Sequence, residues 1–254
     1  MLAARIRKNV VVVELGSVYV RAGYAGEATP RCVWASPTHN LEEWFVDLFA
    51  RGLLAAKASQ LRVVVLESPT VARQWRDARI EALVAAGPPE ALAFAPTSVA
   101  AAAALARATA LVLDVGASEC RAIAVCDGYA VRHSLCVGDD LAALVLTCLD
   151  RCALDTRRRL AANLAPAGGR AMTPGFDARL CADLRALAPG LDFRIAHADF
   201  PRSDLAWTGG SILAAAALVD HRFDGLDPAH PPPDIFAIGS PLVAGIRLDP
   251  PIER

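Results

Sequence analysis

Two stretches of the chain share one pattern of apolar and polar positions. In each, a run of β-branched and aliphatic residues reaches an acid, a glycine turn follows, and a second apolar run returns. The stretches are Val10–Gly26 and Leu111–Gly128, and their acids are Glu14 and Asp114. Apolar runs on both sides of such a turn predict a strand, a tight turn and a returning strand. Because the pattern occurs twice, the chain is predicted to contain two related halves.

The acid and the glycine of each turn suggest a chemistry for the two hairpins. Glycine exposes the backbone amides of a tight turn, and a carboxylate at the end of a strand can hold a hydrated metal ion. Two such hairpins that face each other can hold a polyphosphate between two domains. The candidate residues are Glu14, Gly16, Ser17, Asp114 and Gly116. Ordinary hairpins also use glycine, so the alternative is that these residues serve the turns alone.

Between and after the hairpins, apolar residues recur with helical or strand spacing. The predicted helices are Leu41–Ala56, Val71–Ala86, Pro96–Arg107, Asp155–Asn163, Pro174–Ala188 and Ala206–Val219, with Asn40 and Thr70 capping the first two. A further helix through Leu149 is predicted to start at Asp139 or Asp140. The predicted strands are Thr29–Trp34, Arg62–Glu67, Leu92–Ala95, His133–Gly138 and Phe193–Ala196, and a short apolar element is expected at Asp234–Ile238. This alternation predicts an α/β fold with mixed sheets in two related halves.

Composition narrows the classes of function. The 254 residues are 54% hydrophobic, which is enough for a sizeable core, and the net charge is −1. A nearly neutral chain offers no broad basic surface, so nucleic-acid binding is not expected. The short run Arg157–Arg159 is typical of a solvated helix face. No apolar segment is long enough to predict a membrane span, and the first residues lack the pattern of a cleavable signal peptide.

The seven cysteines do not have the spacing of a metal site. Cys148 and Cys152 lie one helical turn apart, but no CxxC pair or histidine-rich segment accompanies them. A zinc site is therefore not expected. Buried, reduced thiols in a cytosolic protein are the expected state.

Four stretches resemble the actin family, in the order in which that family has them. The first two contain the hairpins, the third contains the pair Gly168–Gly169, and the fourth contains a Trp-x-Gly-Gly-Ser sequence. Their ranges are Glu14–Trp34, Leu111–His133, Asn163–Pro189 and Arg202–Leu213. The resemblance implies the duplicated, ribonuclease-H-like actin fold, with a nucleotide held between its two halves.

Two inserts that actins carry are absent. Between Cys32 and Leu41 there is no room for one outer subdomain, and between Asp140 and Cys148 the chain runs straight on where the other would begin. The resemblance therefore implies an actin-like fold reduced to its two inner subdomains. The first is expected to comprise residues 1–105 with 205–254, and the second residues 106–204.

The resemblance assigns a nucleotide site to residues of both hairpins and of the glycine pair. These residues are Glu14, Gly16, Ser17, Arg21, Asp114, Gly116, Gly168 and Gly169, with Arg21 at the position of an actin lysine. The species bound there would be ATP or ADP with Mg. In the other interpretation, the glycines remain only because the tight turns need them, and no nucleotide binds. The sequence is compatible with both interpretations.

Several positions depart from the actin pattern in ways that remove hydrolysis. Val18 replaces the second glycine of the first turn, where a β-branched residue tolerates positive φ poorly. Ala117 replaces the acid that helps to orient the attacking water, and no glutamine lies near Thr97–Val99. On the adenine side, Thr173 stands where actins place a ring and Ser203 replaces a lysine. Because hydrolysis needs a positioned water and compensated phosphate charge, we expect no catalytic residue and no enzymatic activity.

Softer resemblances point to one branch of the family, the actin-related subunit at the pointed end of dynactin. They lie in Gly26–Cys32, in Cys152–Arg157 with Asn163, and in a tail with Pro231–Pro233, Phe236 and Pro250–Pro251. This resemblance implies a structural subunit that caps an actin-like filament, in the cytoplasm and cytoskeleton. Its partners would be actin-related filament subunits and other pointed-end subunits of dynactin, which supports dynein-driven transport on microtubules. The alternatives are a subunit of a chromatin-remodelling complex and an actin-fold ATPase or sugar-kinase-like enzyme.

Overall fold

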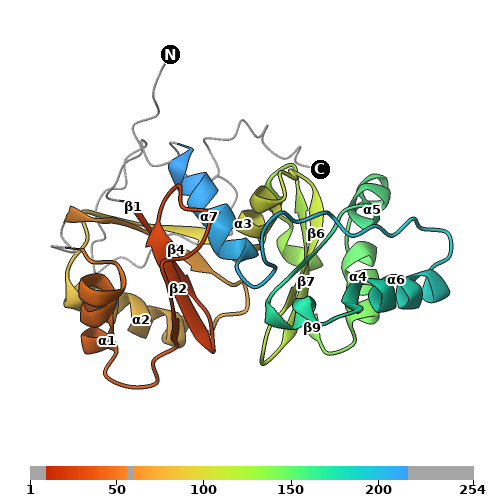
Figure 1. Ribbon diagram of the computed structural model, residues 1–254. Coiled ribbons are helices and arrows are strands. Elements are labelled where there is room, and N and C mark those ends of the chain that lie inside the picture. Colours follow the sequence, from red (N-terminus) through yellow and green to blue (C-terminus); the bar gives the residue numbers. More distant parts are fainter. Residues whose placement is uncertain (1–9, 56–59, 217–254) are drawn as a thin grey trace, which may run out of the picture. The chain divides into compact units, whose positions relative to one another are not determined.

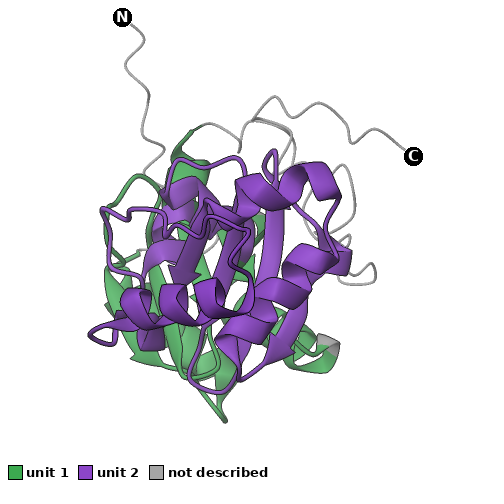
Figure 2. Cartoon of the chain, turned by 90° about the vertical axis from the view of Figure 1, so that its right-hand side faces the viewer, with its two compact units in different colours: residues 1–97, 210–245 green, residues 98–209, 246–254 purple. Residues whose placement is uncertain are grey.

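The computed structural model describes residues 10–55 and 60–216 of the chain (Figure 1). These residues fall into two compact units (Figure 2). In the described part, unit 1 comprises residues 10–97, apart from 56–59, together with 210–216, and unit 2 comprises residues 98–209. The boundaries expected from the sequence, at 105/106 and 204/205, both fall within unit 2.

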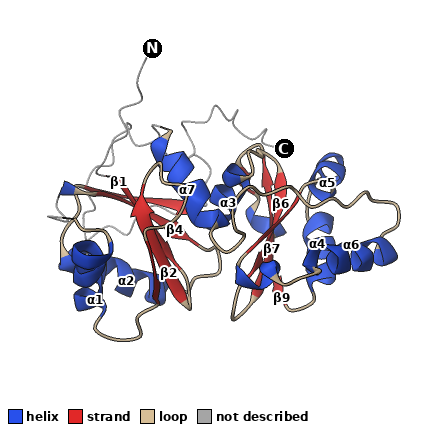
Figure 3. Cartoon of the chain, in the orientation of Figure 1, coloured by secondary structure: helices blue, strands red, loops and turns tan. Residues whose placement is uncertain are grey.

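Unit 1 is built on a mixed sheet of five strands in the order β3-β2-β1-β4-β5 (Figure 3). The strands are β1 (Val10–Leu15), β2 (Tyr19–Tyr24), β3 (Cys32–Ala35), β4 (Arg62–Glu67) and β5 (Ala91–Pro96). Strand β1 pairs antiparallel with β2 and parallel with β4, and β4 pairs parallel with β5. The middle valines of β1, Val11–Val13, are fully buried, as expected for a central strand that is covered on both faces.

Two helices of unit 1, α1 (Leu41–Asp47) and α2 (Arg73–Ala86), pack against each other. A π-helical turn, η1 (Leu48–Gly52), follows α1, and the Leu53 N–H donates to the Leu48 carbonyl five residues back. This wider turn ends the regular helix before the predicted end at Ala56.

The predicted side-chain caps of these two helices are wrong. Asn40 does precede α1, but its backbone is left-handed and its side chain makes no capping hydrogen bond. Helix α2 begins after Ala72 rather than after Thr70, again without a side-chain cap. The Thr70 hydroxyl lies instead 3.3 Å from the Ser68 hydroxyl.

Unit 2 contains a second mixed sheet with the path β10-β6-β7-β8, and β9 pairs with β7 beside β8. The strands are β6 (Ala110–Val115), β7 (Cys120–Cys126), β8 (Tyr129–Ala130), β9 (Cys136–Gly138) and β10 (Leu164–Ala167). Strand β6 pairs antiparallel with β7 and parallel with β10. Each sheet therefore contains a hairpin whose first strand also pairs in parallel with a later strand, which is the repeat that the sequence predicts.

In unit 2, α4 packs on β7, α5 packs on β6, and α6 packs on α4. The helices of this unit are α3 (Thr97–Ala104), which begins at the unit boundary, α4 (Leu141–Asp150), α5 (Leu154–Ala161), α6 (Phe176–Leu187), and the short 3-10 turns η3 (Arg132–Ser134) and η4 (Gly169–Met172). Of the two aspartates predicted to start α4, Asp140 is its N-cap, because its carboxylate accepts a hydrogen bond of 3.0 Å from the Ala143 N–H.

Helix α7 (Leu205–Ala215) begins in unit 2 and ends in unit 1. Within unit 2, its Gly209 lies directly against the backbone of α3. A Cβ atom at Gly209 would overlap the Ala100 carbonyl oxygen and would lie 2.5 Å from the carbonyl carbon. This close approach of two helix backbones requires a residue without a side chain.

The predicted fold class, α/β with mixed sheets, is confirmed, and one predicted strand is wrong. Phe193–Ala196 contributes only an isolated parallel bridge, between Leu164 and Ile195. The predicted end of α7 at Val219 and the element Asp234–Ile238 lie outside the described residues. In the part of the chain that the structure describes, no helix has the length and apolar character to cross a membrane.

Candidate functional site

The two hairpin turns have the same backbone geometry. In unit 1 the Gly16 N–H donates to the Tyr19 carbonyl at 3.1 Å, and in unit 2 the Gly116 N–H donates to the Glu119 carbonyl at 3.1 Å. Each acid also faces an arginine across its hairpin, because Glu14 is paired with Arg21 and Asp114 with Arg121. The repeated feature is therefore an acid, a glycine turn and a cross-strand arginine.

In unit 1, the turn itself explains the presence of glycine at position 16. A Cβ there would overlap the Tyr19 carbonyl oxygen, which accepts the hydrogen bond that closes the turn. Ser17 and Val18 are exposed at the tip, while Glu14 and Arg21 are partly buried behind it. Unit 1 thus brings together four of the predicted site residues, Glu14, Gly16, Ser17 and Arg21.

In unit 2, Arg121 lies between two carboxylates. Its Nε is 3.0 Å from Glu119 Oε1, and its Nη1 is 3.6 Å from Asp114 Oδ2. The Arg121 side chain is only 14% exposed, so solvent screens these ion pairs less than it would at the surface. The carboxylate that could hold a hydrated metal ion is therefore already compensated by a cation of the chain itself.

Arg170, in η4, reaches the same turn from a distant part of the sequence. Its Nε–H donates to the Gly116 carbonyl, and its Nη2 lies 2.8 Å from the Cys120 sulfur. Burial raises the pKa of the Cys120 thiol, and the positive charge of Arg170 opposes that rise. The guanidinium of Arg170 thus holds both ends of the Gly116 turn.

The two glycines of the Gly168–Gly169 pair have different environments. Gly168 has a φ of +93°, and a Cβ there would lie 2.6 Å from the Val115 carbonyl oxygen and 3.1 Å from Asp114 Oδ1. Its N–H donates to the Arg202 carbonyl at 2.8 Å. Gly169 has no atom within 4 Å of the corresponding position. Unit 2 therefore packs Gly168 against the strand that carries Asp114 and leaves Gly169 in open space.

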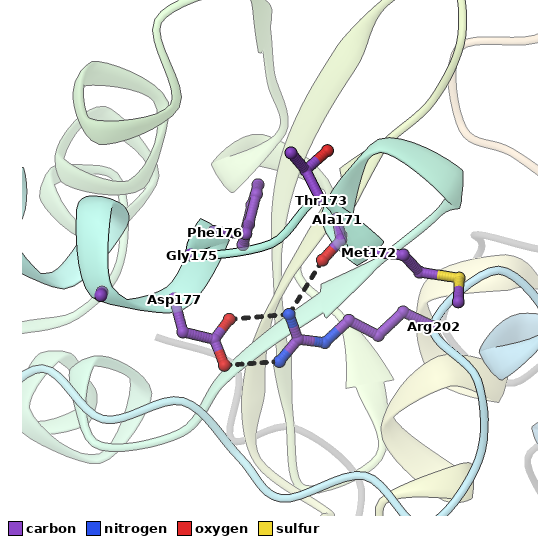
Figure 4. Close-up of a pocket in the computed structure, with 8 residues that line it drawn as sticks. Ala171, Met172, Thr173, Gly175, Phe176, Asp177 and Arg202 are labelled. Atoms are coloured by element: carbon purple, nitrogen blue, oxygen red, sulfur yellow. Dashed lines mark hydrogen bonds and ion pairs between the residues drawn. The ribbon is translucent and has the colours of Figure 1, made fainter.

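Beyond this turn, an open pocket of about 460 Å³ lies at the start of α6 (Figure 4). It is lined by Ala171, Met172, Thr173, Gly175, Phe176, Asp177, Ala178 and Arg202. The Arg202 guanidinium donates to both Asp177 carboxylate oxygens, at 2.7 and 2.8 Å, and to the Ala171 carbonyl at 3.0 Å. The one arginine of the pocket is thus bound to a carboxylate in a two-pronged pair, which leaves little charge for a ligand.

The two adenine-side positions named from the sequence lie in different places. Thr173 lines the pocket, and its hydroxyl donates to the Arg170 carbonyl at 2.8 Å. Ser203 is absent from the lining, and its hydroxyl donates to the Asp204 carboxylate at 3.0 Å. The pocket therefore has no ring at the Thr173 position and no lysine at the Ser203 position to receive a base.

The residues of unit 2 do not fit a nucleotide with its metal ion. Asp114 is paired with Arg121, and Arg170 occupies the Gly116 turn. No group of three or more potential ligands is arranged to hold a metal ion among the described residues. Mg²⁺ sites in proteins depend on carboxylates and on phosphates, and an arginine beside the carboxylate opposes such a site.

Arg21 is among the site residues predicted from the sequence, whereas Arg121 and Arg170 are not. Arg121 had a signal, because Asp114 and Arg121 have the same spacing as Glu14 and Arg21. Arg170 had none, because it lies 54 residues from the turn that it holds.

A family model for actin matches residues 38–147 and 138–222. The chain belongs to the actin family. The match is divided at α4, which is where the sequence analysis places a missing insert, and it does not include the first hairpin. The order of hairpins, parallel strands and helices in each unit is compatible with an actin-like fold that is reduced to two subdomains.

Individual relatives in the actin family are similar over shorter segments. An actin-like protein of Neurospora crassa is 37% identical over 94 residues, which are 37% of this chain and 24% of the relative. Actin-like protein 7B of Rattus norvegicus is 42% identical over 76 residues, 30% of this chain and 18% of the relative. Actin-related protein 4 of Schizosaccharomyces pombe is 37% identical over 75 residues, which are 28% of this chain and 17% of the relative. The chain thus covers a quarter or less of the length of these relatives.

Proposed function

We propose that the chain is a non-catalytic, actin-related structural subunit that caps the pointed end of an actin-like filament in dynactin. The observation that supports a structural, non-catalytic role is the hairpin turn at Gly116 in unit 2. There, Arg121 pairs with the Asp114 carboxylate and Arg170 donates to the Gly116 carbonyl. The guanidinium groups of these two arginines therefore stabilise the turn without a ligand. Bound nucleotide is therefore not required to organise it.

The capping role is supported by two short connections. In unit 1, β3 ends at Ala35 and α1 begins at Leu41, and in unit 2, β9 ends at Gly138 and α4 begins at Leu141. Actin-like filaments grow through contacts of outer subdomains with the next protomer, and neither connection has room for one. Since a specific interface needs at least ~1,000 Å² of buried surface, a protomer without these parts would join a filament on one side only.

Within the family, the proposed counterpart is actin-related protein ten or eleven, the pointed-end actin-related subunit of dynactin. The support is the sequence around Gly26–Cys32 and Cys152–Arg157. The proposal includes filament subunits and other pointed-end subunits as partners, a cytoplasmic, cytoskeletal location, and a role in dynein-driven transport on microtubules.

Two other functions are distinguishable by experiment. An actin-fold ATPase would need an open metal site, which disagrees with the Asp114–Arg121 pair. A subunit of a chromatin-remodelling complex would be compatible with the same two units. Identification of the chains that co-purify with the full-length protein would separate it from a dynactin subunit.

The first prediction concerns nucleotide. Mg-ATP at millimolar concentration should leave the melting temperature of the full chain unchanged, and the chain should not hydrolyse ATP. A ligand present at 100 times its dissociation constant would add about 2.7 kcal/mol to the free energy of unfolding. Since each added kcal/mol raises the melting temperature by about 2–4 °C, binding would produce a shift that is easy to measure. Differential scanning fluorimetry and a phosphate-release assay would measure both. ATP turnover that Asp114→Asn abolishes would contradict the non-catalytic proposal.

The second prediction concerns the filament end. Gold-labelled protein should appear in electron micrographs at one end of actin-like filaments and nowhere along their sides. Arg158→Glu should weaken this binding several-fold if α5 faces the filament, because Arg158 is exposed. Its neighbours are unsuitable for the test: Arg157 donates to the Cys152 and Asp150 carbonyls, and Arg159 pairs with Asp127.

The matched control for the filament experiment is Arg107→Glu, a charge reversal at another exposed arginine outside α5 and α6. Decoration along the sides or at both ends would rule out capping. Equal loss of binding in the Arg107 and Arg158 variants would show that net charge, rather than the α5 face, controls it.

A further inference from the structure

In unit 1, the strand register identifies one face of the sheet from an inner strand to the edge strand β3. Leu66 of β4 pairs with Glu14 of β1, which pairs in turn with Arg21 of β2. Arg21 pairs with Val33 of β3. Because directly paired residues project to the same face of a sheet, these four side chains mark a single face.

Helix α7 covers the inner part of this face. Its Gly210 lies against Leu66, since a Cβ at Gly210 would come within 2.7 Å of Leu66 Cδ1. The turn η1 lies on the opposite face, because a Cβ at its Gly52 would lie 3.0 Å from the Cys32 sulfur. Cys32 precedes Val33 in β3, and successive residues of a strand project to opposite faces.

The outer part of the same face, on β2 and β3, is apolar and exposed. Tyr19 pairs with Ala35, two positions from the Arg21–Val33 pair, so both residues project to this face. Tyr19 is 50% exposed and Val33 is 46% exposed, and Ala35 is exposed as well. We call Tyr19, Val33 and Ala35 the β2–β3 patch. Neighbouring apolar side chains that are exposed together are typical of a surface that another segment covers.

The hairpin of unit 2 repeats this register with different residues. Its Arg121 pairs with Val137 of β9, which is 50% exposed. The positions that correspond to the other two residues of the β2–β3 patch are Glu119 and Asp139. Unit 2 thus has charged side chains, which water solvates well, where unit 1 has a tyrosine and an alanine. The hairpin architecture itself therefore does not require the apolar patch of unit 1.

The chain itself contains a segment that can cover the patch. Helix α7 brings the chain onto this face, and residues 217–254 follow it, outside the described residues. Their sequence contains the apolar element Asp234–Ile238, with Ile235 and Phe236 next to each other. More than ten residues separate this element from α7. Ten extended residues span about 30 Å, whereas five paired strands are about 20 Å across, so the element can reach the patch.

We propose that the Asp234–Ile238 element packs on the β2–β3 patch, with its aromatic and aliphatic side chains against Tyr19 and Val33. The contact is intramolecular, and burial of apolar side chains on both partners stabilises it. Because α7 tethers the element to unit 1, its effective concentration at the patch is high, and a small apolar contact is sufficient. This inference does not depend on the function proposed above.

The first test replaces Tyr19 of the full chain by the photo-crosslinking amino acid p-benzoyl-phenylalanine. After irradiation, we expect a crosslink from position 19 to Asp234–Ile238 by peptide mass spectrometry, in protein that migrates as a single chain. Phe236→Asp should lower the yield at least about tenfold, because it removes a buried aromatic ring. Leu248→Asp in the same tail should leave the yield unchanged. Crosslinks to another segment, crosslinks to a second copy, or no crosslink at all would overturn the proposal.

The second test needs no unnatural amino acid and uses chymotrypsin, which cleaves after phenylalanine. Val33→Asp places a charge in the β2–β3 patch, so it should speed cleavage after Phe236 several-fold and leave cleavage after Phe223 unchanged. The matched control is Val137→Asp, because Val137 is a similarly exposed valine that also pairs with an arginine. It should change neither rate. Equal cleavage after Phe236 in the two variants would contradict the proposal, even where position 19 does not accept the crosslinker.

Discussion

Gly209→Ala should lower the free energy of unfolding more than any other glycine substitution considered for this protein. A Cβ at this position would overlap the Ala100 carbonyl oxygen and would lie 3.1 Å from the Ala104 nitrogen. Both obstacles belong to the backbone of α3, which cannot turn aside as a side chain can. Overpacking of this kind costs about 3 kcal/mol or more, and it exceeds the gain of about 1 kcal/mol from the better helix propensity of alanine.

Urea unfolding of the two proteins would measure this loss, with a lower midpoint and an unchanged slope as the expected result. Two other glycines provide graded controls. For Gly210→Ala in the same helix, the three atoms nearest to the new Cβ all belong to the flexible Leu66 side chain, the first at 2.7 Å, and Gly190→Ala meets no atom within 4 Å. The expected order of destabilisation is Gly209, then Gly210, then Gly190. A stable Gly209→Ala variant would mean that α3 and α7 are not packed as closely as described.

Gly168→Ala should be the second most damaging of these changes, and it should act without any ligand. Its backbone has a φ of +93°, which costs an L-residue about 1–3 kcal/mol, and the added Cβ would lie 2.6 Å from the Val115 carbonyl oxygen. We expect a total loss of about 2–4 kcal/mol in nucleotide-free buffer. This result would assign Gly168 to the fold of unit 2 rather than to nucleotide binding.

The neighbouring glycine makes the comparison direct. Gly169→Ala has open space around the new methyl group, so its unfolding midpoint should remain close to that of the unmodified chain. Thermal or urea unfolding without nucleotide measures both variants. If Gly168→Ala unfolds at the normal midpoint and differs only when Mg-ATP is added, then the glycine is retained for a ligand.

Local signals allowed much of the fold to be predicted. The two hairpins, strand Arg62–Glu67 and the start of α4 at one of two aspartates follow from residues that are neighbours in sequence. The helix expected to run to Ala56 instead changes to a π-helical turn at Leu48–Gly52. No residue type in this segment predicts such a turn. Phe193–Ala196 has the apolar composition of a strand, but it has only one bridge, to Leu164, and a strand needs a partner along its length.

The candidate site was predictable only in part, for a related reason. Gly16 and Gly116 follow from the turns themselves, and Gly168 follows from the resemblance to actins. Their physical role could not be read from the sequence, because it depends on the carbonyl groups that a Cβ would meet. Arg121 and Arg170 act through side-chain contacts in three dimensions, and the second of them crosses 54 residues of sequence.

The tethered arginines at the second turn have a consequence for timing. A group that belongs to the chain is present at a constant, high effective concentration, whereas a bound nucleotide varies with the energy state of the cell and changes as it is hydrolysed. If the chain is the filament subunit proposed above, a turn held by Arg121 and Arg170 would keep one shape however long the subunit has been in the filament.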